Sequence, residues 1–213
     1  MTVTRLLLAS TSPARLASLR SAGIEPVVHP PGVDEEKVLA EATARFGSIS
    51  AEDAALTLAR AKSEAISATT SGDFLVLGCD SVLEIDGAIH GKPAGAAEAT
   101  ARWQAMRGSS GVLHTGHWLV DVRSAAMGGT GGAIGSTAST RVHFADLTDA
   151  EIDAYVATGE PLRVAGAFTI DGLGGPFVSG VEGDPHNVIG LSLPLLRNLL
   201  ADLGVPITEL WRR

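Results

Sequence analysis

The chain has 213 residues, a mass of 21.8 kDa and a formal net charge of −8 from 16 basic and 24 acidic side chains. This acidic balance argues against general binding of nucleic acid or of anionic membranes, because both need a basic surface. The sequence has no apolar run near the roughly 20 residues of a membrane span and no signal-peptide pattern, so we expect a cytoplasmic protein. An apolar fraction of 45% with alternating strand-like and helix-like segments predicts one α/β domain over residues 1–213, with two lobes sharing a core as the alternative.

The first apolar run, residues 6–9, predicts a buried strand that leads directly into a helix. Ser12 is suited to cap that helix and Pro13 to occupy its first position. A helix start behind a strand presents free backbone N–H groups and the positive end of the helix dipole. Because Ser10, Ser12 and Arg15 add donors there, we interpret the turn as an anion site suited to phosphate. A well-capped helix with an exposed arginine has the same pattern, and these residues alone leave both interpretations open.

Two more helices follow a short predicted strand at residues 26–29. The first opens at the acidic group 34–36, where Glu36 is an ordinary partner of the helix dipole, and runs to about residue 45. The second covers about residues 51–68 and places Lys62 within an apolar stripe. Such a lysine either extends to water or lines a cleft that faces an anion, and the pattern is compatible with both.

A hairpin in the middle of the chain carries further candidate residues. The apolar run at residues 74–77 predicts a buried strand whose end carries Asp80. A second strand at 82–85 turns at Asp86-Gly87, a strong hairpin signal, and the return arm leads to Lys92. An aspartate at a strand end and a lysine on the same hairpin can face one cleft.

The rest of the chain predicts a mixture of helices, strands and loops. We expect helices at about 96–106 and 148–159, strands at 112–121 and 136–144, loops at 165–175 and 182–187, and a last helix at 188–203 that Pro194 kinks or restarts. His114 and His117 are three apart in a strand, so they point to opposite faces and make a poor metal pair.

The chemistry-bearing residues are carboxylates and cations around one helix start. The set comprises Asp80, the pair Asp34-Glu35, and the cations Arg15, Lys62 and Lys92. Carboxylates together with phosphate oxygens form the usual site for Mg²⁺ or Mn²⁺. The set fits metal-assisted phosphoryl chemistry with water as the nucleophile.

The sequence resembles the Maf family of nucleoside triphosphate pyrophosphatases, also called septum formation inhibitor proteins. The matching pieces lie in order at residues 8–15, 34–35, 58–62, 79–81, 91–93, 159–161, 165–166 and 187–191. The resemblance implies a mixed sheet flanked by helices, two lobes around a deep nucleotide cleft, and often a homodimer. It also implies that nucleoside triphosphates, including non-standard or modified ones, are hydrolysed to monophosphate and pyrophosphate with a divalent metal. A part in nucleotide-pool housekeeping and cell-division arrest is implied as well.

The resemblance also assigns roles to residues. Asp80 falls at the family's proton acceptor, and Asp80 and Glu35 are the implied metal ligands. The implied phosphate and metal contacts are Ser10, Arg15, Glu35, Lys62 and Lys92, and Asp171 falls in the nucleotide-selective loop. Ser12, which caps the first predicted helix, is added to these as a substrate contact.

The chain departs from the family pattern at four places. Ala14 replaces one of two usual arginines, Gly111 a histidine, and Arg163-Val164 an Asp-Lys pair. Asp171 replaces a glutamine, which resembles the branch that acts on 7-methyl-GTP and carries a glutamate there. The alternative hypothesis is a nucleotide-binding regulator of division with little hydrolytic activity, for which Ala14 and Val164 are the best support.

Overall fold

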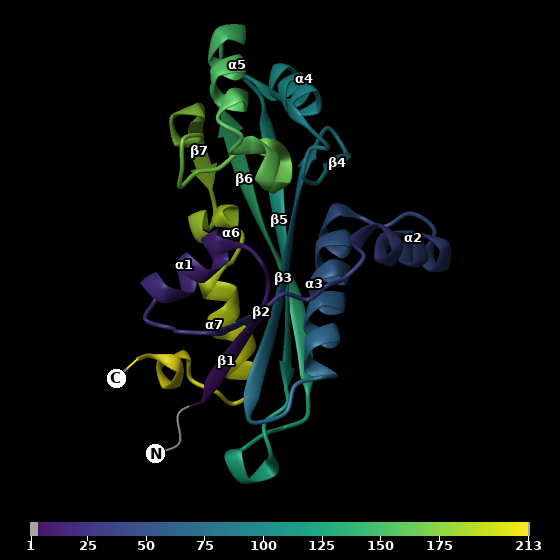
Figure 1. Cartoon of the computed structure of the whole chain (residues 1–213), viewed down its shortest axis with the longest axis vertical. Helices are drawn as coiled ribbons and strands as arrows, with labels where there is room; N and C mark the ends of the chain where they lie inside the picture. The colour runs from purple at the N-terminus through teal and green to yellow at the C-terminus, as the bar shows by residue number, and fades with distance from the viewer. Residues whose placement is uncertain (1–3, 213) are drawn as a thin grey trace.

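The structure is a computed structural model that describes residues 4–212. It contains a seven-stranded mixed sheet flanked by helices, which confirms the predicted α/β class (Figure 1). The strands are β1 (Arg5–Ala9), β2 (Val27–His29), β3 (Phe74–Ile85), β4 (Ala88–His90), β5 (Ser110–Asp121), β6 (Ala133–Phe144) and β7 (Val178–Glu182). Their order is β2-β1-β3-β5-β6-β7, with β4 paired to β3 beside this path. The helices are α1 (Pro13–Ser21), α2 (Glu35–Phe46), α3 (Ala51–Ser67), α4 (Ala96–Met106), α5 (Asp149–Ala157), α6 (Pro185–Ile189) and α7 (Leu193–Asp202).

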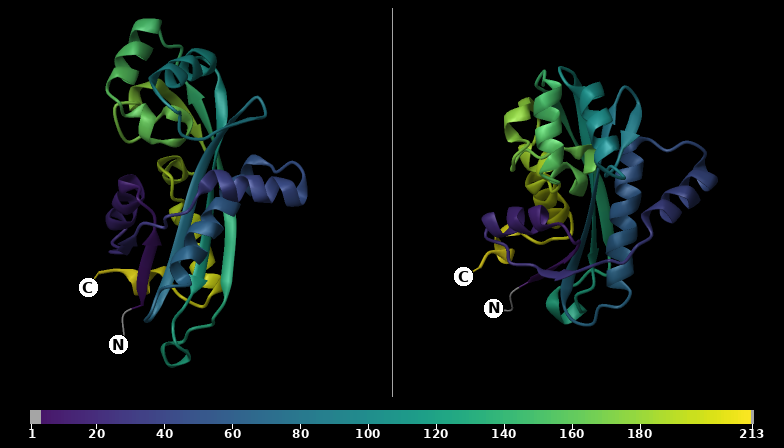
Figure 2. Two further views of the ribbon diagram at one scale, coloured as in Figure 1. Left: turned by 45° about the vertical axis from the view of Figure 1, so that its right-hand side comes forward. Right: turned by 45° about the horizontal axis from the view of Figure 1, so that its top comes forward.

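Three long strands run the length of the molecule. β3, β5 and β6 each have 12 residues and pair antiparallel, whereas β1 pairs in parallel with both β2 and β3. β1, α1, α3 and α7 lie along the lower part of these strands, and α4 and α5 lie at the upper end (Figures 1 and 2). Both ends of the molecule therefore share the same strands.

Helix α3 packs unusually close to the sheet. A Cβ atom built on Gly78 would lie 2.1 Å from the carbonyl oxygen of Ala59, and one built on Gly116 would lie 2.3 Å from that of Ala55. Neither distance is possible for a real side chain, so both positions require glycine. The contact fixes α3 against β3 and β5.

The opposite face of the sheet buries two separate apolar clusters. The lower cluster packs Leu77 and Cys79 of β3 against α1 and α7. The upper cluster surrounds Trp103 of α4, contains Leu83 of β3, and stacks Trp103 edge-on against Tyr155 of α5. Because side chains at even spacing along a strand share one face, a single strand supplies both clusters.

The structure corrects the prediction for residues 74–85. They form one strand rather than two, so Asp80 lies inside β3 and not at a strand end. β3 pairs with β5 continuously from Leu75 to Glu84, and Gly78 does not interrupt it. The sequence pattern ends the first strand before Gly78, whereas in the structure this glycine lies within β3 and allows α3 to approach.

In the C-terminal region the structure confirms the second of the two alternatives predicted for Pro194, a restart of the helix rather than a kink. Ser192 caps α7 and Pro194 occupies its first turn, so the proline restarts the helix after α6. The predicted loop at residues 165–175 contains short 3₁₀ turns, and the strand β7 follows it without having been predicted. No helix within residues 4–212 has the length and apolar character needed to cross a membrane.

Candidate active site

A cavity of about 1110 Å³ opens where β3 changes its pairing partner. β1 ends beside Gly78, and β4 ends beside Leu83, so no described strand pairs with this edge of β3 at residues 79–82. Ligand sites in open α/β sheets commonly lie beyond the carboxyl ends of parallel strands, at such a switch in connectivity. The predicted catalytic, metal-binding and substrate-binding residues all line this cavity: Ser10, Ser12, Arg15, Glu35, Lys62, Asp80, Lys92 and Asp171.

An ion pair between Asp80 of β3 and Lys62 of α3 lies in the cavity wall. Both residues are only 7% exposed, and the Lys62 ammonium also lies 2.8 Å from the carboxylate of Glu35 at the start of α2. Lys62 therefore lines a cleft and does not extend to water. Burial raises the pKa of Asp80, and the positive charges of Lys62 and Arg15 oppose that rise.

Arg15 is held rigidly at the start of α1. Its Nε donates to the carbonyl oxygen of Gly190 at 2.7 Å, and its two terminal nitrogens donate to the hydroxyls of Ser10 at 3.3 Å and Ser81 at 3.0 Å. The side chain is buried, so the alternative of a surface arginine is wrong. Ser12 caps α1 as predicted, accepting from the Arg15 backbone N–H at 3.4 Å.

Buried polar side chains of β5 fasten the segment that carries Gly190. The Thr115 hydroxyl lies 2.9 Å from that of Ser81 and donates to the carbonyl oxygen of Asn187 at 3.2 Å. His117 accepts from the Ser192 backbone N–H at 2.9 Å, and burial lowers the pKa of His117 to about 4, so its ring is neutral. No local pattern in the sequence marks this network, because its members come from distant segments.

The remaining lining residues come from the hairpin and from the segment after α5. Lys92 and Asp171 are exposed at the cavity, and its lining also includes Glu160, Arg163 and Thr169. Glu160 accepts several hydrogen bonds from the loop that follows it. No role was predicted for Glu160 from the sequence, although it lies within one of the pieces that match the family pattern.

The donor set fits an ion of the magnesium type. Mg²⁺ usually binds one or two carboxylates and completes its shell with phosphate oxygens and water. Asp80 and Glu35 supply two carboxylates around a common point, the Lys62 ammonium. No group of three or more histidine, cysteine, aspartate or glutamate residues suited to a metal occurs within residues 4–212. An ion here would therefore depend on the substrate for part of its coordination.

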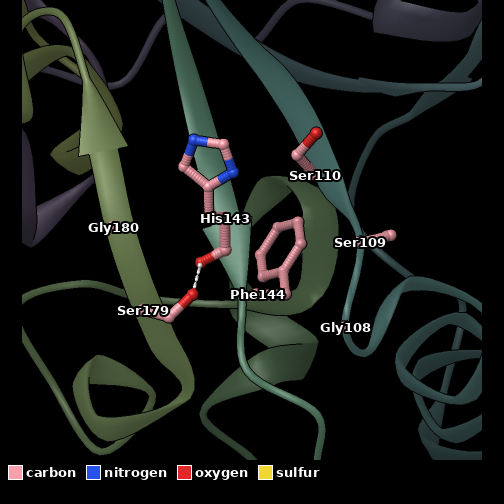
Figure 3. A pocket seen from close by; sticks show the side chains of 7 residues that line it. All are labelled: Gly108, Ser109, Ser110, His143, Phe144, Ser179 and Gly180. Atoms are coloured by element: carbon pink, nitrogen blue, oxygen red, sulfur yellow. Dashed lines mark hydrogen bonds between the residues drawn. The ribbon is translucent and has the colours of Figure 1, made fainter.

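A second hollow, of about 450 Å³, lies between β5, β6 and β7. Figure 3 shows its lining, in which the Ser179 hydroxyl donates to the carbonyl oxygen of His143 at 3.2 Å. The His143 ring lies 2.7 Å from Glu182. The other lining residues are glycines, serines and Phe144, so this hollow has little of the charge that the larger cavity contains.

Comparison with known proteins identifies the family. The chain is 57% identical over 212 residues to a nucleoside triphosphate pyrophosphatase of Leifsonia xyli subsp. xyli, covering 98% of this chain and 97% of that protein. It is 56% identical to a protein of the same name from Salinispora tropica, over 98% of this chain and 88% of that protein. It is also 56% identical to one from Streptomyces coelicolor, over 97% of this chain and 94% of that protein. The sequence profile described as "Maf-like protein" matches residues 5–203. The chain therefore belongs to the family of Maf-like proteins.

Proposed function

We propose that this protein hydrolyses nucleoside triphosphates to nucleoside monophosphate and pyrophosphate. The observation that carries the proposal is the buried contact between Asp80 and Lys62 in a cavity whose wall also contains Arg15 and the start of α1. Cations and a helix N-terminus attract phosphates, and a carboxylate among them can activate water. The names of the relatives at 56–57% identity support the same activity.

The reaction that we propose divides the work among these residues. Arg15, Lys62 and Lys92 neutralise the phosphate chain and hold it in the cavity. Asp80 accepts a proton from a water molecule, whose oxygen attacks the α phosphorus. The bond from that phosphorus to the bridging oxygen breaks, and pyrophosphate leaves with the electron pair.

We also propose that Asp80 and Glu35 hold a divalent cation, Mg²⁺ or Mn²⁺. Such an ion, when bound, neutralises phosphate charge and polarises the phosphorus for attack. Lys62 contacts both carboxylates in the structure, so we expect its ammonium to move toward a phosphate oxygen when they bind the ion.

A panel of nucleotides with resolved products tests the proposal. We expect pyrophosphate and monophosphate in the presence of Mg²⁺ or Mn²⁺, and loss of product after chelation with EDTA. Diphosphate with orthophosphate would contradict the cleavage position. Nucleotide binding without any pyrophosphate release would favour the alternative, a regulator with little hydrolytic activity.

Three broader expectations belong to the same proposal. We infer that the protein acts in the cytoplasm as one domain, forms a homodimer, and clears nucleotides with consequences for cell division. Light scattering measures the oligomeric state. Division arrest on overexpression, compared between the wild type and an inactive variant, tests whether hydrolysis is linked to division.

A further inference from the structure

The loop at residues 169–174 carries three side chains into the lining of the cavity. They are Thr169, Asp171 and Leu173, and Leu173 is 59% exposed. The loop contributes a carboxylate and no cation, whereas Arg15 and Lys62 enter the cavity from α1 and α3. Because a carboxylate repels phosphate, the loop is suited to the uncharged end of a nucleotide, which is the base.

Glu160 holds this loop at both ends. One carboxylate oxygen, Oε1, accepts from the Thr169 hydroxyl at 2.6 Å and from the Gly174 backbone N–H at 3.0 Å. The other, Oε2, accepts from the Leu173 backbone N–H at 3.1 Å. The Tyr155 hydroxyl of α5 donates to Oε1 at 3.0 Å and accepts from the Thr169 backbone N–H at 3.2 Å. The Glu160 carboxylate therefore connects both ends of the loop to each other and to α5.

The backbone of the loop fits closely against these two side chains. A Cβ atom on Gly172 would lie 2.6 Å from Oε2 of Glu160, and one on Gly174 would lie 2.4 Å from the hydroxyl of Tyr155. At Gly174 the Cβ would also lie 2.7 Å from the backbone carbonyl oxygen of Thr169, so this position requires glycine. At Gly172, directly after Asp171, a Cβ would displace the Glu160 carboxylate from its position against the loop.

Glu160 is already engaged by four donors within the protein. Three of them donate to Oε1 and one donates to Oε2. Burial acts to raise the pKa of Glu160, but the hydrogen bonds from Thr169, Leu173, Tyr155 and Gly174 outweigh it and hold the pKa below its usual value. The group is ionised at neutral pH, and all four of its hydrogen-bond partners belong to the loop or to α5.

We propose that Glu160 is a positioning residue for base selection: it fixes the loop that presents Asp171 and Leu173 to the nucleobase. This inference rests on the proposed function, because it assumes that the cavity binds nucleotides. It predicts that removal of the hydrogen bonds of Glu160 changes the ranking of bases by kcat/KM more than it changes kcat.

The substitution Glu160→Gln tests the inference with little change in volume. The amide nitrogen must face the N–H of Leu173 or that of Gly174, and neither backbone group can accept a hydrogen bond. The hydroxyls of Tyr155 and Thr169 can rotate, so the loss falls on the loop backbone. We expect KM for the preferred nucleotide to rise about tenfold, equal to about 1.4 kcal/mol, with kcat within about threefold of wild type. The ratio of kcat/KM between the best and worst base should fall by a similar factor.

Glu151→Gln is the matched control. Glu151 belongs to the capping box that begins α5, where its carboxylate accepts from the Thr148 backbone N–H at 2.8 Å, and it does not line the cavity. This variant also loses a carboxylate hydrogen-bonded to a backbone N–H near the same helix. It should leave KM and the base ranking unchanged.

Two further measurements make every outcome decisive. Hydrogen exchange at the Leu173 and Gly174 amides should accelerate in Glu160→Gln, and Tyr155→Phe should shift the base ranking in the same direction if the first variant does not fold. The base ranking is also measured as Kd for each nucleotide. If the wild type binds nucleotides without releasing pyrophosphate, the proposed function is wrong, but the Kd ranking still tests the role of Glu160. An unchanged ranking in a folded Glu160→Gln protein, or unchanged exchange at both amides, overturns the inference. Absence of nucleotide binding by the wild type overturns both.

Discussion

Asp80 and Lys62 lie 18 residues apart in the chain and form a direct buried ion pair. Asp80 lies on the face of β3 that also presents Gly78, and Lys62 comes from α3, the helix that Gly78 contacts. A residue larger than glycine at position 78 would push α3 away from the sheet. The geometry of the charged pair therefore depends on the absence of a side chain two residues earlier.

Replacement of Asp80 by asparagine should abolish most turnover and preserve the fold. A positioned general base contributes typically ~10²–10⁴ in rate, so we expect a fall in kcat of that size. Circular dichroism checks the fold and steady-state kinetics measure kcat. Asp86→Asn, at the β3–β4 turn where φ is 48°, removes an exposed carboxylate of the same hairpin and serves as the control. Retention of more than about a tenth of wild-type kcat in Asp80→Asn would rule out the base role.

Replacement of Lys62 by alanine should weaken nucleotide binding. A hydrogen bond to a charged group is worth about 1.5–3 kcal/mol, so we expect KM to rise by about 10- to 150-fold. Lys37→Ala is the matched control, since Lys37 on α2 is 70% exposed at its side chain and lies 4.0 Å from Glu41. Equal KM and kcat in Lys62→Ala and wild type would mean that the Lys62 ammonium does not contact phosphate.

Replacement of Gly78 by alanine should destabilise the protein and reduce activity together. The new Cβ would meet backbone atoms of α3, which cannot rotate away, and overpacking of this kind costs typically about 1–3 kcal/mol. Chemical denaturation measures the free energy of unfolding. At Gly95 the backbone is extended, with φ of 177°, and a Cβ meets nothing within 4 Å, so Gly95→Ala should be tolerated. A Gly78→Ala protein as stable and as active as wild type would contradict the dependence of the ion pair on this contact.

The sequence predicted best those features that depend on neighbouring residues. The Ser12 cap of α1 is such a local pattern, and the structure contains it. The role of Gly78 could not be predicted in this way, because the atom that requires glycine there belongs to Ala59 of another element.

The residues of the candidate site were also predicted from the sequence only where a local pattern or the family resemblance marked them. Lys62 stood out as a charge in an apolar stripe and Glu35 as part of an acidic pair, whereas the family resemblance supplied Asp171. The hydrogen bonds of Glu160 connect it to residues as far as position 174, and no periodicity marks them. The cavity brings the predicted residues together, and their roles in catalysis and binding stay predictions.

A buried ion pair at the far end of β5 should make stability depend on acid pH. Burial acts to raise the pKa of Asp121, but hydrogen bonds from Arg123 and Thr130 outweigh it and lower the pKa to about 2. Because this value lies below the roughly 3.9 of an unfolded aspartate, the contribution to stability is complete above about pH 4 and is lost as the pH falls toward about 2.

The size of that contribution is about 2–3 kcal/mol, and Asp121→Asn should remove it. The free energy of unfolding, measured from pH 2 to pH 6, should differ most between wild type and variant at the upper end of the range. The two curves should converge toward the lower end. A difference that stays constant with pH would mean that Asp121 keeps an ordinary pKa in the folded protein.

Asp171→Gln should alter base selectivity, because the two side chains offer different hydrogen-bonding groups. An ionised aspartate only accepts, whereas glutamine both donates and accepts. Uracil and thymine present an N–H between two carbonyls, which an amide can match, whereas guanine-type bases and cytosine present donors suited to a carboxylate. We therefore expect wild type to disfavour UTP and dTTP, and Asp171→Gln to gain on UTP relative to the other nucleotides. A panel of kcat/KM values measures this, with Asp153→Asn on the exposed side of α5 as the control. If wild type already prefers UTP or dTTP and the variant keeps the same ranking, Asp171 takes no part in base recognition.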